Sequence, residues 1–255
     1  VRVSRGFPNV ILLENTTAEG SVASRDALLL RSTADWVLSL DDDSYPLEKN
    51  FFQSALRLIE SHPEVGVFSF PELREGGRYG MNTPSSQARY TAAYANCAAL
   101  MDRSLYLECP GFPGFFEHMY EEPDFSLQCY AMGRGVWLEP SVSIRHHRSA
   151  LNRNHIRRHH QNARNELWSV WLRCPLVLLP LMTLYRVARQ GLYSLQEGLG
   201  WAIREPVWWI DAFRKLPFCW SQRKPVSLHV YRSWLRLPRN AITNPEDFVQ
   251  TFGPR

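Results

Sequence analysis

Three consecutive aspartates, Asp41, Asp42 and Asp43, directly follow the apolar segment 36–40, which predicts a buried strand. Two carboxylates about 5 Å apart repel each other by roughly 3 kcal/mol at an effective dielectric constant of about 20, so a cation should compensate them. In open α/β sheets, ligands bind in the crevice beyond the carboxyl ends of the strands, where oxygen ligands would hold a hard divalent ion. The triplet therefore predicts a site for a divalent ion and its phosphate ligand. The alternative is an acidic turn that caps the next helix through Asp43 or Ser44.

A second acidic cluster, Glu121, Glu122 and Asp124, stands where a helix is predicted to begin. Acidic residues at a helix N-terminus interact favourably with the helix dipole, so capping alone would explain Asp124. Neighbouring side chains point in different directions, which leaves one of the two glutamates free to face a cleft as a general base. The cluster therefore supplies candidate catalytic residues, with helix capping as the alternative role.

Five of the eight histidines lie between residues 146 and 160, and His146 and His147 follow a predicted strand. An imidazole beside the three aspartates would complete a carboxylate–imidazole site for Mn²⁺ or Mg²⁺. The second ring nitrogen of such a ligand needs its own partner, which the sequence does not identify. A purely structural role is the alternative, and the choice between His146 and His147 stays open.

Arginines gather on a helix that we expect to begin near Asn152. Arg157, Gln161, Arg164 and Trp168 fall on one face of it by helical spacing. Such cations could pair with a diphosphate. A solvated or lipid-facing basic surface explains the same pattern equally well.

The elements around these residues alternate between strands and helices. Apolar runs predict strands at 9–14, 36–40 and 65–70, and apolar residues at helical spacing predict helices at 22–31 and 47–61. This order is typical of an α/β sheet covered by helices. The later elements that we expect are a loop at 74–89, a strand within 92–100, a helix at about 122–132, and short strands at 136–138 and 142–145.

Composition and charge divide the chain of 255 residues into two parts. With 45% hydrophobic and 21% charged residues it is neither disordered nor collagen-like. Residues 1–144 hold 11 Lys and Arg against 19 Asp and Glu, whereas residues 145–255 hold 18 against 6. Five cysteines without a C-x-x-C pair imply neither a zinc cluster nor a disulfide framework, and favour a reducing compartment. We expect an α/β domain over residues 1–150 and an amphipathic helical region over residues 151–255.

The helical region interleaves tryptophans with arginines and lysines. Its most apolar window, 174–185, would extend about 18 Å as a helix, short of the ~30 Å hydrocarbon core of a bilayer, and Pro180 interrupts it. Aromatic and cationic residues together suit helices that lie in a membrane interface, so we expect peripheral membrane contact. A small helical domain packed on the first domain is the alternative. The aliphatic residues between Leu176 and Leu184 argue against a nucleic-acid partner.

Taken in order, these features resemble the family 2 inverting glycosyltransferases, which have the GT-A fold, and especially bacterial rhamnosyltransferase-like members that act on cell-surface polysaccharides. The resemblance covers about residues 9–175 and implies a Rossmann-like mixed sheet flanked by helices. The elements that carry it are Glu14-Asn15, Gly20–Asp26, Trp36–Asp43, Gly111–Phe116, Tyr120–Leu127, Gly135–Pro140, His146 and Arg164–Trp168.

The activity that this resemblance implies is transfer of a hexose from a nucleotide-sugar to a hydroxyl group of a glycan or lipid-linked acceptor. The anomeric carbon would be inverted. The acidic triplet matches the family's D-x-D-type motif, Glu122 stands at the position of the catalytic base, and Glu121 and Asp124 match its acidic neighbours. We expect such an enzyme to work peripherally at the cytoplasmic face of a bacterial cell membrane.

The same resemblance implies the ligand sets. Mn²⁺ or Mg²⁺ would be held by Asp41, Asp43 and His146. The nucleotide-sugar would be contacted by Asp41, Asp42, Arg25 and Arg164.

Two features depart from the family pattern. Asp26 stands where the family usually has Asn. Family members also begin with a strand–helix–strand unit that binds the nucleotide base, and this chain starts after most of it, so we expect roughly 60–80 further residues before Val1. A catalytically inactive relative that serves as a membrane-binding or assembly module is therefore the alternative function.

Overall fold

The computed structural model describes residues 6–80, 82–147 and 154–253. Its main sheet has five strands in the order β1-β6-β3-β7-β5. β3 and β7 run parallel, and the other neighbours are antiparallel, so the sheet is mixed as expected. Every residue of β3 is buried, which places this strand at the centre of the core. The strands are β1 (Trp36–Ser39), β3 (Val65–Ser69), β5 (Arg89–Tyr90), β6 (Ala99–Asp102) and β7 (Gly135–Leu138).

A second, three-stranded sheet connects segments that are far apart in the chain. It has the order β2-β8-β4, with β2 at Ser44–Pro46, β8 at Ile144–His146 and β4 at Glu72–Leu73. The register pairs Ser44 with His146 and Glu72 with Ile144. This small sheet therefore brings the residue after the aspartate triplet opposite a histidine about a hundred positions later.

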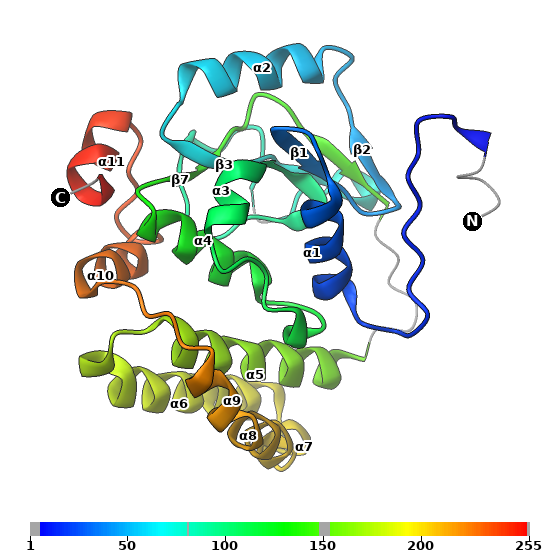
Figure 1. Cartoon of the computed structure of the whole chain (residues 1–255). Helices are drawn as coiled ribbons and strands as arrows, with labels where there is room; N and C mark the ends of the chain where they lie inside the picture. The colour runs from blue at the N-terminus through cyan, green and yellow to red at the C-terminus, as the bar shows by residue number, and fades with distance from the viewer. Residues whose placement is uncertain (1–5, 81, 148–153, 254–255) are drawn as a thin grey trace.

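Helices cover both faces of the main sheet (Figure 1). α2 (Phe51–Ser61) lies on one face, and α1 (Ser21–Arg31), α3 (Arg103–Glu108) and α4 (Glu121–Ala131) lie on the other. The helix predicted at 47–61 begins only at Phe51, because residues 47–50 form the turn that leads from strand β2 (Ser44–Pro46) into it. The mixed α/β architecture predicted from the sequence is confirmed.

Two expected strands differ from the structure. Residues 9–14 form no strand, and Ile11 among them is 72% exposed, because the run pairs with no strand of the described sheets. In the segment 92–100 regular pairing begins only at Ala99, since a 3₁₀ turn at Asn96–Ala98 precedes it. An apolar run thus becomes a strand only where a neighbour offers its backbone groups.

From residue 154 on, the described residues form helices and the segments that connect them. The predicted start of its first helix, near Asn152, lies outside the described residues; α5 begins at His155. Among the helices that the structure describes, none combines the length and the apolar character that crossing a membrane requires. The helices are α5 (His155–Arg173), α6 (Leu179–Glu197), α7 (Leu199–Ala202), α8 (Glu205–Arg214), α9 (Leu216–Ser221), α10 (Leu228–Arg236) and α11 (Pro245–Phe252).

Helix α5 connects the part of the molecule that contains the sheets to the helices that follow it in the chain. A buried ion pair between Arg173 of α5 and Asp124 of α4, 3.0 Å long, fixes it beneath the sheet-bearing part. Helices α6, α8 and α9 pack on α5 and lie farther from the sheet (Figure 1). The last helix returns to the sheet, where Phe248 of α11 stacks on Tyr90 of β5 with ring centroids 4.3 Å apart.

Candidate active site

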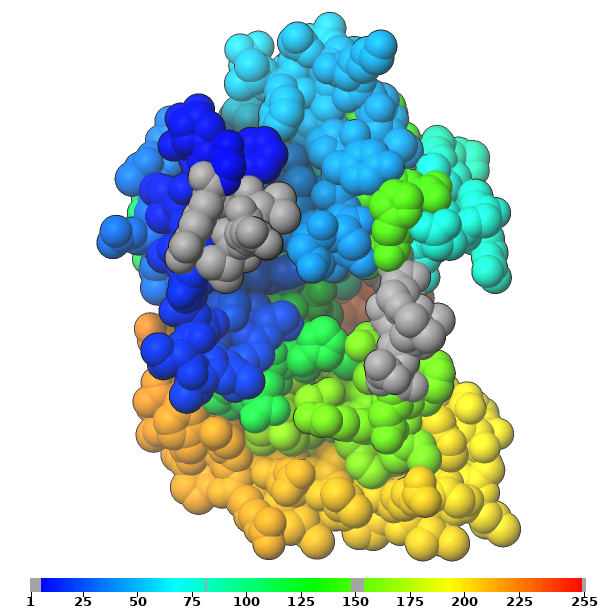
Figure 2. All heavy atoms as spheres, turned by 90° about the vertical axis from the view of Figure 1, so that its right-hand side faces the viewer, coloured from blue at the N-terminus to red at the C-terminus, as the bar shows by residue number. Residues whose placement is uncertain are grey.

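A cavity of about 370 Å³ lies where β1 ends. Seven of the nine site residues predicted from the sequence line it, so the structure brings together the acidic triplet, the glutamate pair, Arg25 and His146. In the space-filling view the surface is hollowed between the dark-blue segment with α1 and the green segments (Figure 2). The lining residues are Ser21, Arg25, Asp41, Asp42, Asp43, Glu72, Arg74, Ala95, Asn96, Cys97, His118, Glu121, Glu122, His146 and Arg158.

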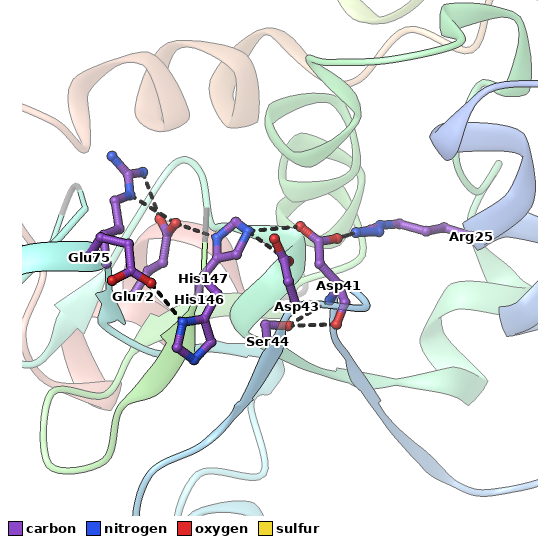
Figure 3. A network of polar contacts seen from close by, with 9 residues as sticks. Arg25, Asp41, Asp43, Ser44, Glu72, Glu75, His146 and His147 are labelled. Carbon is purple, nitrogen blue, oxygen red and sulfur yellow. Dashed lines mark hydrogen bonds and ion pairs between the residues drawn. The ribbon is translucent and has the colours of Figure 1, made fainter. Parts of the chain in front are cut away.

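His146 points its ring at the aspartates (Figure 3). Its Nε2 lies 3.1 Å from Oδ1 of Asp43 and 3.5 Å from Oδ2 of Asp41. The pairing of Ser44 with His146 produces this geometry, because it places the end of β8 beside the end of the triplet. His147 instead contacts Glu75 and Tyr45 outside the cavity, which identifies His146 as the imidazole of this site.

Glu72 is the partner of the second ring nitrogen. Its Oε1 lies 2.6 Å from Nδ1 of His146, and Arg74 donates two hydrogen bonds to the same carboxylate at 2.9 and 2.7 Å. Burial raises the pKa of Glu72, but the hydrogen bonds from Arg74 and His146 outweigh it and hold the pKa below its usual value. An ionised carboxylate only accepts, so Nδ1 carries the proton. In a neutral ring, Nε2 then presents its lone pair to the two aspartates.

This arrangement fits a bound cation. Two carboxylates and an imidazole lone pair converge on one point, and they repel one another unless a cation lies between them. Asp41, Cys97 and His146 also present donor atoms within 4.8 Å of one another. Burial raises the pKa of the Cys97 thiol to about 12, which disfavours the thiolate that a metal would bind. Asp41, Asp43 and His146 are therefore the donor set best suited to Mn²⁺ or Mg²⁺.

The turn that carries the triplet is closed by Ser44. Its hydroxyl accepts from the backbone N–H of Asp41 at 2.7 Å and donates to the carbonyl of Asp41 at 3.0 Å. The next helix starts after Asn50 without a side-chain cap, so neither Asp43 nor Ser44 has the capping role considered above. From α1, the guanidinium of Arg25 contacts the carboxylate of Asp41 (Figure 3).

The glutamate pair occupies the start of α4. Oε1 of Glu121 accepts a hydrogen bond of 3.0 Å from Nδ2 of Asn96, while Oε2 of Glu121 and Oδ1 of Asn96 are buried without a partner among the described residues. Burial raises the pKa of Glu121. Burial, together with the charge of Glu121, raises the pKa of Glu122 to about 8. A carboxylate with so high a pKa is a strong base once it is ionised.

The turn before this pair has an uncommon backbone. Glu117, Met119 and Tyr120 have positive φ angles of 63°, 77° and 72°, which non-glycine residues seldom adopt. Asn165 of α5 stabilises the turn, because its Nδ2 lies 2.8–2.9 Å from the carbonyl oxygens of Phe116, His118 and Met119. A buried amide thus holds the glutamates in place.

The other two predicted residues lie outside the cavity. Asp124 is completely buried and accepts hydrogen bonds from Ser169, Gln128 and Arg173, so it joins α4 to α5 rather than facing a ligand. Arg164 stacks on Trp168, with its guanidinium carbon 4.3 Å from the ring centroid, and does not line the cavity. For these two positions the structure does not support a direct role at the site.

Among the lining residues that were not predicted as site residues, three bear on the chemistry. Arg158, a turn and a half before Arg164, supplies the α5 cation of the cavity. Glu72 and Asn96 also line it, but they stand in segments without a periodic pattern. The arginines of the predicted helix were the only available signal, and only for Arg158, which lies about 100° from the predicted face through Arg157 and Arg164. Asp26 accepts a hydrogen bond of 2.5 Å from Tyr106, which gives it a structural role.

A second cavity, of about 430 Å³, adjoins the first. The two share Glu72, Arg74, Ala95, His118, Glu121, Glu122 and Arg158. The second one adds Tyr94, whose buried hydroxyl has no partner among the described residues. The glutamate pair therefore stands between the acidic cation site and a separate, less charged space.

The chain matches a known family and solved structures. Residues 2–123 match the family model of Glycosyl transferase family 2. A fragment of S. aureus TarS in complex with UDP-GlcNAc is similar, with a TM-score of 0.57 and 16% identity over 86% of this chain and 68% of that chain. The mannosyltransferase PcManGT from Pyrobaculum calidifontis, in complex with GDP-Man and Mn²⁺, is also similar. Its TM-score is 0.51, with 15% identity over 87% of this chain and 69% of that chain.

A third similar structure is GalNAc-T7 with UDP, GalNAc and Mn²⁺, with a TM-score of 0.49 and 11% identity over 64% of this chain; the chain spans only 36% of that protein. No curated protein matches the chain. The similarity to TarS and PcManGT confirms a GT-A-type fold. Residues 2–123 are thus similar to the Glycosyl transferase family 2 model, over slightly less than half of the chain.

Proposed function

We propose that the protein is a metal-dependent, inverting glycosyltransferase that moves a hexose from a nucleotide-sugar to an acceptor hydroxyl group. The observation that carries the proposal is that one cavity is lined both by donor atoms suited to a cation and by a glutamate pair with raised pKa values. The similarity to the family 2 model agrees with it. So do the ligands of the similar structures, UDP-GlcNAc in one and GDP-Man with Mn²⁺ in the other.

On the donor side, Asp41, Asp43 and His146 would hold Mn²⁺ or Mg²⁺. The ion would stabilise the charge that develops on the leaving diphosphate. Glu72 keeps the imidazole in the tautomer that presents Nε2 to the site. Asp42 at the cavity wall is available for the ribose hydroxyls, and Arg25 and Arg158 add positive charge near the phosphates.

On the acceptor side, Glu122 takes the proton of the attacking hydroxyl group. The new bond forms between the acceptor oxygen and the anomeric carbon as the bond from that carbon to the diphosphate oxygen breaks. The nucleoside diphosphate leaves with the electron pair, and the proton remains on Glu122. Attack opposite the leaving group inverts the anomeric carbon in one step. Glu121 contributes by keeping the pKa of Glu122 high.

The proposed acceptor is a glycan or a lipid-linked sugar of a bacterial surface polysaccharide, as for rhamnosyltransferase-like enzymes. Two further cavities support an acceptor with an apolar part. The space of about 430 Å³ beside Glu122 shares Ala93, Tyr120 and Pro123 with another of about 670 Å³. That third cavity is lined by apolar side chains and by arginines, which would suit an amphiphilic acceptor.

The test combines a binding and a turnover measurement. The protein is titrated by calorimetry with UDP and with GDP in the presence of Mn²⁺, and nucleoside diphosphate release is followed with UDP- and GDP-sugars and a lipid-linked acceptor. Asp43→Asn should weaken diphosphate binding at least about 100-fold, because it removes a charged metal ligand. Asp211→Asn, an exposed aspartate on α8, is the matched control and should bind like the unsubstituted protein.

The outcomes separate the candidate functions. Absence of metal-dependent diphosphate binding would exclude the enzyme. Binding without release, with every donor and acceptor supplied, would favour the catalytically inactive membrane-binding or assembly module.

A further inference from the structure

Helix α6 buries three polar side chains and exposes most of its leucines. Arg186, Gln190 and Ser194 are each at most 8% exposed and face α5. At about 100° per residue, five large exposed apolar residues of α6 fall within an arc of about 100° on the opposite side, and the sixth, Tyr193, lies outside it. The five within the arc are Leu181, Leu184, Tyr185, Leu192 and Leu195.

Helix α8 repeats the pattern. Glu205 at its start is buried, whereas Val207, Ile210 and Phe213 are exposed. The short α7 and the residue after it add two more exposed apolar side chains. We call the whole set the outward face; its members are between 48% and 77% exposed, and they are Leu181, Leu184, Tyr185, Leu192, Leu195, Leu199, Ile203, Val207, Ile210 and Phe213.

The buried polar groups of these helices are paired with one another. Glu166 of α5 accepts hydrogen bonds from Arg186 at 2.7 Å and from Gln190 at 2.5 Å. Glu205 accepts from Ser194 and from the indole of Trp208 at 2.7 and 2.8 Å. The helices therefore bury polar pairs beside the apolar Met182, Trp208 and Ala212, and they also expose the apolar side chains of the outward face. Large apolar side chains gathered in this way on an exposed side indicate a contact with an apolar phase.

The outward face continues into an apolar cavity. This cavity, of about 820 Å³, lies between α6, α8 and α9 and shares Leu184 and Phe213 with the face. Three tryptophans also line it, and Trp220 among them is 52% exposed. Figure 2 shows these yellow and orange helices at the bottom of the molecule, below the hollow. An acyl chain that enters from below would meet carbon atoms almost everywhere.

The charges around this face are mainly positive. Residues 179–224 contain seven Lys and Arg against three Asp and Glu, and Glu205 is buried among its hydrogen-bond donors. Arg204 and Arg214 are exposed at the two ends of α8. Two copies of the chain joined by a two-fold axis through this face would bring such cations together, whereas anionic lipid headgroups would neutralise them.

We propose that the outward face docks on an anionic lipid bilayer, with α6 and α8 lying along the headgroups and an acyl chain entering the 820 Å³ cavity. This inference does not depend on the reaction proposed above. It requires only that the described helices lie on the membrane.

Vesicle flotation of the full chain tests the proposal. The vesicles are an equimolar mixture of phosphatidylglycerol and phosphatidylcholine, or phosphatidylcholine alone. The double variant Leu192→Gln/Ile203→Gln should lower the partition coefficient at least about tenfold, because two large side chains no longer leave water for the lipid. Each cation near the surface should add about a fivefold preference for the anionic vesicles at low salt.

A matched control is available on the opposite side of the molecule. Phe52 and Leu56 of α2 are 65% and 61% exposed, close to the 61% of Leu192. Phe52→Gln/Leu56→Gln should float like the unsubstituted protein. The proposal is wrong if the unsubstituted protein stays in solution with both vesicles, or if the two double variants lose the same affinity. It is also wrong if gel filtration without lipid gives a dimer that Leu192→Gln/Ile203→Gln dissociates and that vesicles leave intact.

Discussion

Replacing Glu122 by glutamine should stabilise the fold and abolish sugar transfer. Glu122 is a carboxyl group whose pKa in the folded protein is raised from 4.5 to about 8, by burial and by the charge of Glu121. Between these two pH values the folded protein binds more protons than the unfolded chain, so stability falls as pH rises. Glutamine has nearly the same shape but does not titrate, so the stability of the variant does not fall with pH for this reason.

The size of the effect follows from the shift in pKa. At about 1.4 kcal/mol per pKa unit, the shift sets a ceiling of about 5 kcal/mol at pH 8. Glu121 and Glu122 repel each other only when both are ionised, so part of this energy belongs to the pair and not to Glu122 alone. We therefore expect Glu122→Gln to raise the free energy of unfolding by about 2–3 kcal/mol at pH 8. At pH 5 the difference should nearly vanish.

Urea unfolding at the two pH values, without added metal, measures this difference. Glu60→Gln is the matched control, because Glu60 is an exposed carboxylate of α2 and should show no comparable change between pH 5 and pH 8. On the same preparations, Glu122→Gln should lower the turnover number by about 10²–10⁴-fold, the usual contribution of a general base.

Two results would refute this reasoning. If Glu122→Gln is less stable than the unsubstituted protein at pH 8, the carboxylate stabilises the fold and its pKa is not raised. If the gain in stability is the same at pH 5 as at pH 8, it comes from packing and not from ionisation.

Two further substitutions separate positioning from structural roles. Glu72→Gln weakens the acceptor of the His146 Nδ1 proton and should lower Mn²⁺ affinity about 10–100-fold in calorimetry, with the circular dichroism spectrum unchanged. Unchanged affinity would remove Glu72 from the metal site. Asp124→Asn leaves the buried Arg173 without its charged partner and should lower the free energy of unfolding by about 3 kcal/mol, while the folded variant keeps its turnover number. A loss of turnover without a loss of stability would restore Asp124 as a catalytic candidate.

The sequence was sufficient to predict which chemical groups meet. The apolar strand before the aspartates belongs to the main sheet and the strand that ends in His146 to the small sheet, and the structure places Asp43 and His146 3.1 Å apart. The strand pattern therefore predicted that these side chains meet; that they hold a cation stays a prediction. The pattern could not predict the partner of the imidazole, because Glu72 reaches the site only through the register of the small sheet.

The acidic cluster at α4 shows where sequence reasoning fails. Successive residues of a helix point about 100° apart, so Glu121, Glu122 and Asp124 must face different surroundings. Which of them faces the cavity depends on a distant residue: Arg173 lies 49 positions beyond Asp124 and draws that carboxylate into the core. Nothing near the cluster in the sequence marks this pairing. A local acidic pattern thus predicts the presence of a base but not its identity.

Adjacent residues of α5 connect the site to the outward face. Asn165 stabilises the turn before the glutamate pair. This turn has three positive φ angles, which would cost of order 1–3 kcal/mol each without such support. Glu166, the next residue, accepts the hydrogen bonds of α6. The turn before Glu122 and the helices of the outward face are thus held by one turn of the same helix. In the docked state that we propose, Glu122 would therefore stay at a fixed height above the lipid headgroups, where an acceptor anchored in the bilayer would meet it at a constant distance.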